Sequence, residues 1–185
     1  MAKKFEDMKL KDFLSALGSK NGAPGGGAAA ALTGACGAGL VEMVSRLNDS
    51  RKGTVSPAAA RLSGVRKKLQ ALISKDAQAF GRIHALYKVR QEKKAAWQSA
   101  LKAGAKPPLE IGGLCIEAAR LSKNEKPRTS AWLQSDLREA LILLEAAYRG
   151  AKLNVEINLK EINDAAFLKP TRRKLDEWKK QWQKF

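Results

Sequence analysis

The sequence is poor in the residues that build disulfide frameworks and metal clusters. Its 185 residues include two cysteines, Cys36 and Cys115, and a single histidine, His84. Neither cysteine has metal-type spacing to a further ligand, which excludes a His/Cys metal cluster. Two isolated cysteines are also typical of a reduced chain. We therefore expect a cytoplasmic protein without a metal site.

A hydrophobic run long enough to cross a membrane is also missing. The chain passes from Met1 directly into mixed charges, without the apolar core of a signal peptide. The apolar stretch 28–41 has 14 residues and is rich in glycine, which is too short for a bilayer. This stretch predicts a buried helix and no contact with a membrane.

Acidic residues are outnumbered by basic ones. Lysine and arginine total 35 against 18 aspartates and glutamates, which gives a net charge of +17. The excess is spread over the chain and is strongest in residues 51–68, 88–106 and 169–185. Such a surface attracts anions, including nucleic acid, a polyanionic metabolite or an acidic partner. Charge alone leaves these three classes open.

Strand patterns are nearly absent, whereas apolar residues recur with the period of a helix from end to end. The length fits one domain. We expect an all-α, up-and-down bundle of about six to eight helices over residues 1–185, with a basic helix at about 170–185. The other expected helices cover residues 5–17, 28–47, 57–87, 93–102, 107–121 and 130–148, with a further helical segment over 153–162.

The most informative segment joins Pro24-Gly25-Gly26-Gly27 to an alanine-rich helix. Three consecutive glycines indicate positive φ, a tight turn or a ligand lying against bare N–H groups. The helix that follows directs its first free N–H groups and the positive end of its dipole toward the same place. An anionic or carbonyl-bearing ligand would fit there. The alternative is a flexible connection between two helices.

Two carboxylates interrupt apolar helix faces. Asp76 falls between Leu72 and Phe80 on the apolar stripe of its helix, and Asp136 lies at the edge of the apolar face of a later helix. A carboxylate inside a bundle needs hydrogen bonds, a cation or a raised pKa, and acid–base chemistry uses such groups. The alternatives are a rim position for Asp76 and a helix-start role for Asp136.

Two amides form a third polar feature. Asn154 and Asn158 are four residues apart and share one side of a helix. Two amides in this arrangement can read the donor and acceptor edge of a heterocycle. The alternative is that they tie two helices together by hydrogen bonds.

These elements occur in the order of a known family. The motifs are Ala23-Pro24-Gly25-Gly26-Gly27-Ala28, Gly34-Ala35, Met43-Val44, Asp76-Ala77, Ala79-Phe80, Ser135-Asp136, Asn154-Val155 and Asn158-Leu159. In this order, over residues 10–168, the chain resembles the cyclodeaminase/cyclohydrolase family. That family includes formiminotetrahydrofolate cyclodeaminase domains and stand-alone bacterial methenyltetrahydrofolate cyclohydrolases.

The resemblance implies an all-helical homodimer with a folate, including polyglutamylated forms, in a cleft near the glycine loop. It implies no cofactor beyond this tetrahydrofolate substrate. Asp76 and Asp136 are the family-type acidic positions for proton transfer and for holding the cationic one-carbon centre. The substrate-binding positions would be Pro24, Gly25, Gly26, Gly27, Asn154 and Asn158.

The resemblance leaves two reactions open, namely cyclohydrolysis of 5,10-methenyltetrahydrofolate and cyclodeamination of 5-formiminotetrahydrofolate. The absence of a formiminotransferase domain within these residues favours the cyclohydrolase. Ala23 and Ala28 stand where the family commonly has hydroxyl residues, so two hydrogen bonds are missing. The alternative from another class is a non-catalytic helical protein that binds a polyanion such as nucleic acid, although the sequence has no nucleic-acid motif beyond its charge.

Overall fold

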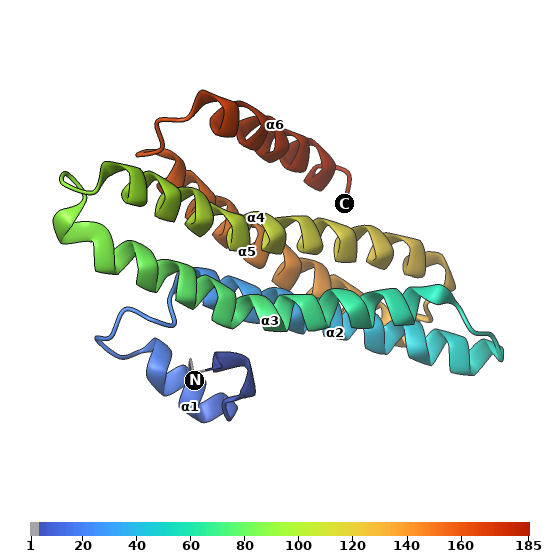
Figure 1. The fold of residues 1–185 in the computed structure, drawn as a ribbon. Coiled ribbons are helices and arrows are strands. Elements are labelled where there is room, and N and C mark those ends of the chain that lie inside the picture. Colours follow the sequence, from blue (N-terminus) through green and yellow to red (C-terminus); the bar gives the residue numbers. More distant parts are fainter. Residues whose placement is uncertain (1–3) are drawn as a thin grey trace.

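The structure is a computed structural model that describes residues 4–185, and it is built from helices (Figure 1). Within these residues there is no strand, so the predicted all-α class is confirmed. The α-helices are α1 (Leu10–Leu17), α2 (Gly26–Lys52), α3 (Pro57–Leu86), α4 (Lys94–Glu125), α5 (Gln134–Leu159) and α6 (Ala165–Trp182). Short 3₁₀ turns cover Phe5–Asp7, Tyr87–Val89, Lys126–Arg128 and Ala131–Leu133.

The four long helices α2 to α5 run alternately up and down and form an elongated bundle (Figure 1). Short connections force consecutive helices to pack antiparallel. One such connection begins at Gly53, whose φ of 61° ends α2, and Pro57 then begins α3 at the predicted position. As a result, the start of α2, the end of α3, the start of α4 and the end of α5 meet at one end of the molecule (Figure 1).

Small residues on α2 allow α5 to approach closely. A Cβ added at Gly37 would lie 2.8 Å from Leu144 Cγ and 3.0 Å from the carbonyl oxygen of Ala140. Helix α2 is long and apolar enough to cross a membrane by composition, but 61% of its most apolar window is buried in the bundle. Its residues Ala31, Ala38 and Val41 are fully buried. The predicted buried helix is therefore confirmed, and it is longer than residues 28–47.

The expectation of two separate helices over 93–102 and 107–121 is wrong. The chain forms one helix, Lys94–Glu125, with Pro107 and Pro108 in its interior. Proline lacks the N–H for the helical hydrogen bond and crowds the carbonyl four residues earlier, which predicts a break. Both prolines are buried, however, and α4 is packed against α3 and α5 along its length. Tertiary packing here overrides the local signal.

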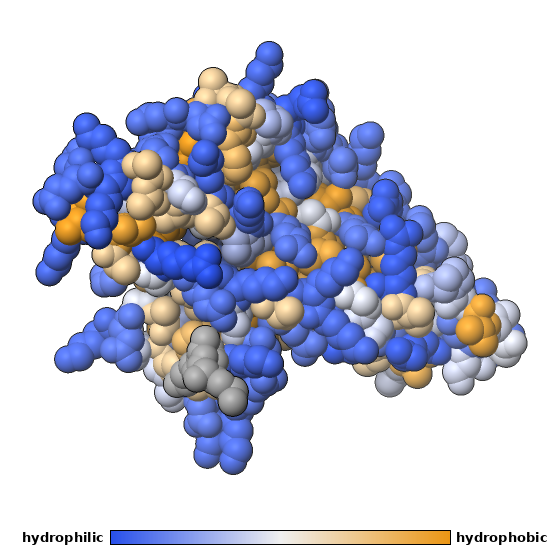
Figure 2. All heavy atoms as spheres, in the orientation of Figure 1, coloured by the Kyte–Doolittle hydropathy of each residue, from blue (hydrophilic) through white to orange (hydrophobic). Residues whose placement is uncertain are grey.

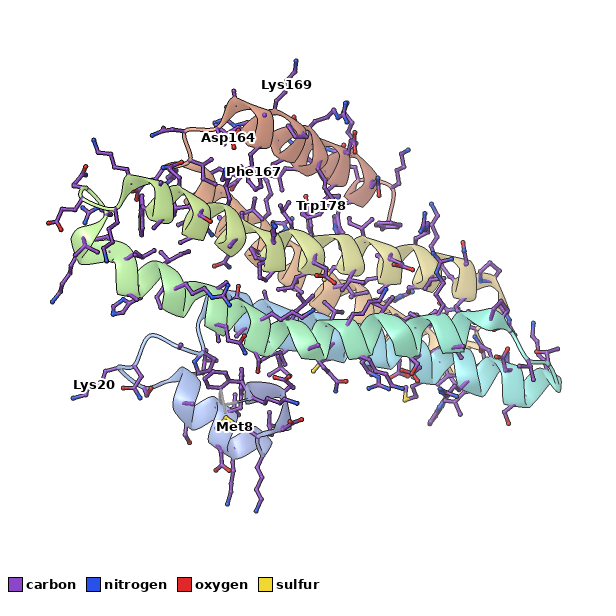
Figure 3. All side chains as sticks on the ribbon, in the orientation of Figure 1. Met8, Lys20, Asp164, Phe167, Lys169 and Trp178 are labelled. Carbon is purple, nitrogen blue, oxygen red and sulfur yellow. The ribbon has the colours of Figure 1, made fainter. Side chains whose placement is uncertain are left out.

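The C-terminal helix α6 begins at Ala165, five residues before the expected start at Pro170. The Asp164 side chain caps it by accepting a hydrogen bond from the Phe167 N–H at 3.1 Å. Phe167 and Trp178 point from α6 toward the bundle, whereas Lys169 points away (Figure 3). Trp178 is 4% exposed. Its ring lies where a Cβ at Gly112 would be, so this glycine on α4 allows α6 to dock.

The basic residues lie mainly on the outside of the bundle. Hydrophilic residues cover most of the face visible in Figure 2, with long side chains extending from it. This distribution agrees with the net charge of +17, which the core cannot hold.

Candidate active site

A pocket of about 350 Å³ opens at the end of the bundle where four helix ends meet. Each of the four long helices contributes side chains or backbone to its wall, together with the loop that precedes α2. The wall residues are Gly22, Gly25, Gly26, Gly27, Asp76, Phe80, Ile83, Tyr87, Trp97, Leu101, Gly104, Asn154, Ile157, Asn158 and Glu161. A volume of this size suits a small-molecule ligand.

The glycine segment forms one wall of the pocket and begins α2. Gly25 is the N-cap residue, and Gly26 and Gly27 are the first helical residues. None of these three has a positive φ, whereas Gly22 does, with φ of 71°. Pro24 follows a cis peptide bond, is buried, and does not belong to the pocket wall. Of the predicted binding residues in this segment, the structure therefore brings Gly25, Gly26 and Gly27 to the pocket.

The close approach of the Asp76 side chain explains why position 27 is a glycine. A Cβ at this position would collide with the carboxyl group of Asp76, which lies directly against the glycine backbone. The equivalent Cβ at Gly26 would make an ordinary contact of 3.7 Å with Asn154 Nδ2. The structure thus brings Asp76 against the glycine segment, and only position 27 requires the absence of a side chain for this contact.

Asp76 lies on α3 and is half-buried, and it faces the N-terminus of α2. The backbone N–H of Ala28 donates a hydrogen bond to its carboxyl group and lowers its pKa. Burial acts in the opposite direction and is the larger effect, so the pKa of Asp76 rises from 3.8 to about 6. A carboxyl group with this pKa is mainly ionised at neutral pH, and it gains and releases a proton readily.

The first turn of α2 adds free hydrogen-bond donors to the pocket. The first N–H groups of a helix have no partner within the helix. Within residues 4–185, the N–H groups of Gly26 and Gly27 have no other partner, because the first bond of this turn runs from Ala29 N–H to Gly25 O at 3.0 Å. These donors and the helix dipole favour a carbonyl or anionic group of a ligand.

Asn154 and Asn158 both lie in the wall, as the sequence predicts. Each donates its amide N–H to α5 itself, Asn154 to Gly150 O and Asn158 to Asn154 O, both at 2.8 Å. Their side chains therefore do not tie two helices together by these bonds. A Cβ at Gly104 would lie 3.2 Å from Asn158 Oδ1. The amide oxygens thus remain as acceptors at the pocket.

Several wall residues were missed from the sequence. Phe80, Ile83 and Tyr87 continue the stripe of Asp76 at helical spacing, which is a signal that could have been followed. The rings of Tyr87 and Trp97 meet edge to face at 6.3 Å between centroids. Trp97 lies in the first turn of α4, and no local sequence pattern indicates that this turn reaches the same pocket.

Asp136 does not belong to the pocket of its own chain. It lies in the first turn of α5, at the other end of the bundle from Asn154. With a rise of 1.5 Å per residue, the two positions are separated by about 27 Å along the helix. A carboxylate in the first turn interacts favourably with the helix dipole. This position matches the helix-start alternative for Asp136.

No group of three or more histidine, cysteine, aspartate or glutamate side chains in the described part of the chain could hold a metal ion. The ionisable side chains in the pocket wall are Asp76, Tyr87 and Glu161, and lysine, arginine and histidine are absent from that wall. The aromatic and acidic lining favours a ligand with a positive centre.

Comparison with known proteins agrees with these motifs and with this site. The sequence model of the family described as formiminotransferase-cyclodeaminase matches residues 9–177. The chain belongs to the formiminotransferase-cyclodeaminase family. The matched range includes the glycine segment, Asp76 and both asparagines, and it extends beyond residue 168 into α6. The resemblance carried by the sequence motifs is thereby confirmed.

Individual members of the formiminotransferase-cyclodeaminase family are similar over most of the chain. A methenyltetrahydrofolate cyclohydrolase of Methylorubrum extorquens is 33% identical over 90% of this chain and 86% of its own length. A rat formimidoyltransferase-cyclodeaminase is 28% identical over 91% of this chain, which spans only 34% of that longer protein. The crystal structure of a formiminotetrahydrofolate cyclodeaminase from Thermotoga maritima superimposes with a TM-score of 0.89 at 30% identity, over 96% of this chain and 91% of that one.

Proposed function

We propose that this family member is a folate one-carbon enzyme, and specifically a methenyltetrahydrofolate cyclohydrolase that converts 5,10-methenyltetrahydrofolate and water to 10-formyltetrahydrofolate. The observation that carries the proposal is the Asp76 carboxyl group, which lies against Gly27 in a pocket lined by aromatic and acidic residues. The similarity to the Methylorubrum cyclohydrolase over nearly the whole of both chains supports it.

Asp76 would carry the proton in this reaction. The methenyl carbon is bonded to N5 and N10 and shares their positive charge. Water attacks this carbon while the Asp76 carboxylate takes one of its protons. The bond from the carbon to N5 then breaks, and its electron pair stays on N5, which receives the proton from Asp76. The hydroxyl group becomes the formyl carbonyl and releases its proton to solvent. A pKa of about 6 suits both proton transfers.

The rest of the wall would bind and orient the substrate. Asp76 and Glu161 place negative charge around the cationic carbon, and the rings of Tyr87 and Trp97 offer cation–π contacts. The free N–H groups at the start of α2 favour a carbonyl oxygen of the pterin. The amide oxygens of Asn154 and Asn158 can accept hydrogen bonds from its ring N–H and amino groups.

The test is the loss of absorbance of 5,10-methenyltetrahydrofolate with purified protein. Wild type should accelerate this loss, and Asp76→Asn should slow the enzymatic rate by about 100-fold or more, because the proton carrier is gone. Asp176→Asn makes the same chemical change at an exposed position of α6 and should retain wild-type activity. Absence of acceleration by wild type would refute the cyclohydrolase.

The match to the Thermotoga cyclodeaminase supports a second candidate reaction at the same pocket. Ring closure of 5-formiminotetrahydrofolate releases ammonia, so an ammonia assay with that substrate distinguishes it. Ammonia release without loss of methenyl absorbance would assign the chain as a cyclodeaminase. Salt-sensitive binding of duplex DNA without affinity for any folate would instead favour the polyanion-binding alternative.

We further propose that the chain forms a homodimer through α5. Ile142, Leu153 and Ile157 are exposed apolar residues on this helix, at 68%, 61% and 63% exposure. Ile157 also belongs to the pocket wall. Light scattering after size-exclusion chromatography should give twice the chain mass of 20.1 kDa for wild type. The Leu153→Lys variant should give the mass of one chain.

A further inference from the structure

The solvent side of α3 carries a line of positive charges. Helix α3 lies along one side of the bundle from one end to the other (Figure 1). Residues seven apart are nearly two helical turns apart, so four exposed cations fall on one side of the helix and form the α3 stripe: Arg61, Lys68, Lys75 and Arg82. With a rise of 1.5 Å per residue, the stripe is about 32 Å long. The only acidic residue in the sequence 57–86 is Asp76, which faces the pocket, so no carboxylate of α3 itself neutralises the stripe.

A groove between α3 and α4 lies beside the α3 stripe. It has a volume of about 340 Å³, and its wall contains Lys75 and Arg82 from α3 and Lys106 from α4. Glu110 is the one carboxylate among the residues that form this wall. Within residues 4–185, these three cations and Lys68 form no ion pair. Four positive charges along the stripe and the groove are therefore available to an anion.

The α3 stripe lacks the apolar anchors of a protein interface or a membrane-binding surface. Within α3, which the structure describes completely, the one exposed large apolar residue is Phe80, and it belongs to the wall of the Asp76 pocket. Protein interfaces are enriched in aromatic residues and depleted of lysine, and helices that bind a membrane surface use bulky apolar residues. Interfaces with nucleic acid are polar and strongly positive. A second copy of the chain is disfavoured, because the two stripes would repel each other.

We propose that the α3 stripe and the adjoining groove bind the phosphate backbone of a nucleic-acid duplex, in addition to the function of the Asp76 pocket. The length of the stripe, about 32 Å, is close to one turn of B-form DNA, about 34–36 Å. Proteins that bind single strands stack the bases on aromatic side chains, and the stripe has none. Contacts to phosphates alone do not depend on sequence. No cation of the stripe or the groove belongs to the wall of the Asp76 pocket, so a duplex and a small molecule can bind together.

The test is fluorescence anisotropy with a labelled DNA duplex of about 20 base pairs and random sequence, which is two helical turns. Wild type should bind it at about 50 mM salt, and the affinity should fall steeply as salt is added, because phosphate contacts release counterions. The triple variant Lys68→Gln, Lys75→Gln, Arg82→Gln should bind at least about tenfold more weakly. The slope of log affinity against log salt should become shallower by about 2.7 in this variant and by about 0.9 in Lys75→Gln alone.

A matched control separates the α3 stripe from the overall charge of the protein. The variant Arg172→Gln, Lys179→Gln, Lys180→Gln removes the same charge from exposed positions of α6, and it should keep the wild-type affinity and salt slope. The melting temperature of both triple variants should equal that of wild type, which distinguishes a lost contact from a lost fold.

Two results would overturn the inference, namely no binding of the duplex by wild type or equal losses in the two triple variants. Poly-aspartate and vesicles that contain anionic lipid are additional probes. If either one binds as tightly as the duplex and is weakened equally by the α3 triple variant, the stripe recognises an acidic protein or a membrane instead. None of these results depends on turnover of a folate, so failure of this inference leaves the proposed cyclohydrolase standing.

Discussion

Replacing Asp76 by asparagine should make the protein more stable at neutral pH while it removes the activity. Burial keeps the carboxyl group partly dehydrated and raises its pKa from 3.8 to about 6, so ionising it in the folded state costs free energy. Asparagine has nearly the same shape and keeps an oxygen for the Ala28 N–H. It carries no charge, so this cost disappears.

The size and the pH dependence of the effect follow from the pKa difference. At 1.36 kcal/mol per unit, a rise from 3.8 to about 6 gives an upper value of about 3 kcal/mol in the free energy of unfolding. The pKa of Asp76 is higher in the folded than in the unfolded state, so its protonated form stabilises the fold. This stabilisation is present at low pH and is lost as the pH rises toward 6. The gain in the free energy of unfolding from Asp76→Asn should therefore reach its full value above about pH 7. It should fall to about 1 kcal/mol near pH 4.5.

Urea unfolding of wild type, Asp76→Asn and Asp176→Asn between pH 4.5 and 8 measures this difference. Asp176→Asn controls for the loss of one negative charge from a highly basic protein. An Asp76→Asn variant that is less stable than wild type at pH 8, or a difference that does not change with pH, would refute the reasoning. A gain of stability together with a loss of turnover would show that Asp76 is required for activity and lowers the stability of the fold.

Four further results are expected. Gly27→Ala should lower kcat/KM for methenyltetrahydrofolate by about 100-fold by displacing Asp76, whereas Gly26→Ala should stay within about fivefold because its new Cβ has room. In wild type, log kcat/KM should rise with unit slope up to about pH 6 and then level off, as the Asp76 base ionises. Asp136→Asn should stay within about twofold of wild-type turnover, and a large loss would place this residue in a site formed with a second copy. Trp178→Ala should lower the free energy of unfolding in urea by about 3–5 kcal/mol, since the ring is 4% exposed.

The sequence alone was sufficient for the helical class and for the residues around the glycine turn. Asp76 could be found because a carboxylate on an apolar stripe is conspicuous, and Asn154 and Asn158 because their spacing places them on one face. The reason for the glycines was only partly predicted. Close approach to Asp76 explains Gly27, and the positive φ lies at Gly22 instead.

Features that depend on the meeting of distant helices could not be predicted. Pro107 and Pro108 carry a strong local signal for a break, and only the packing of α4 between its neighbours overrules it. Trp97 and Glu161 reach the pocket because α4 starts and α5 ends at the same end of the bundle. Asp136 carries a family-type motif, but chain direction puts it at the opposite end.

The pocket wall draws on residues from 22 to 161, so a fragment that lacks any one of the four long helices lacks part of the site. A small molecule held there connects the first long helix to the last helix of the bundle, and it is released when either one detaches. Ligand binding consequently increases the free energy of unfolding of the entire domain. A ligand at 100 times its Kd increases it by about 2.7 kcal/mol. Protease resistance and melting temperature therefore become readouts of occupancy, and a collection of pterins can be ranked by thermal shift before any of them is turned over.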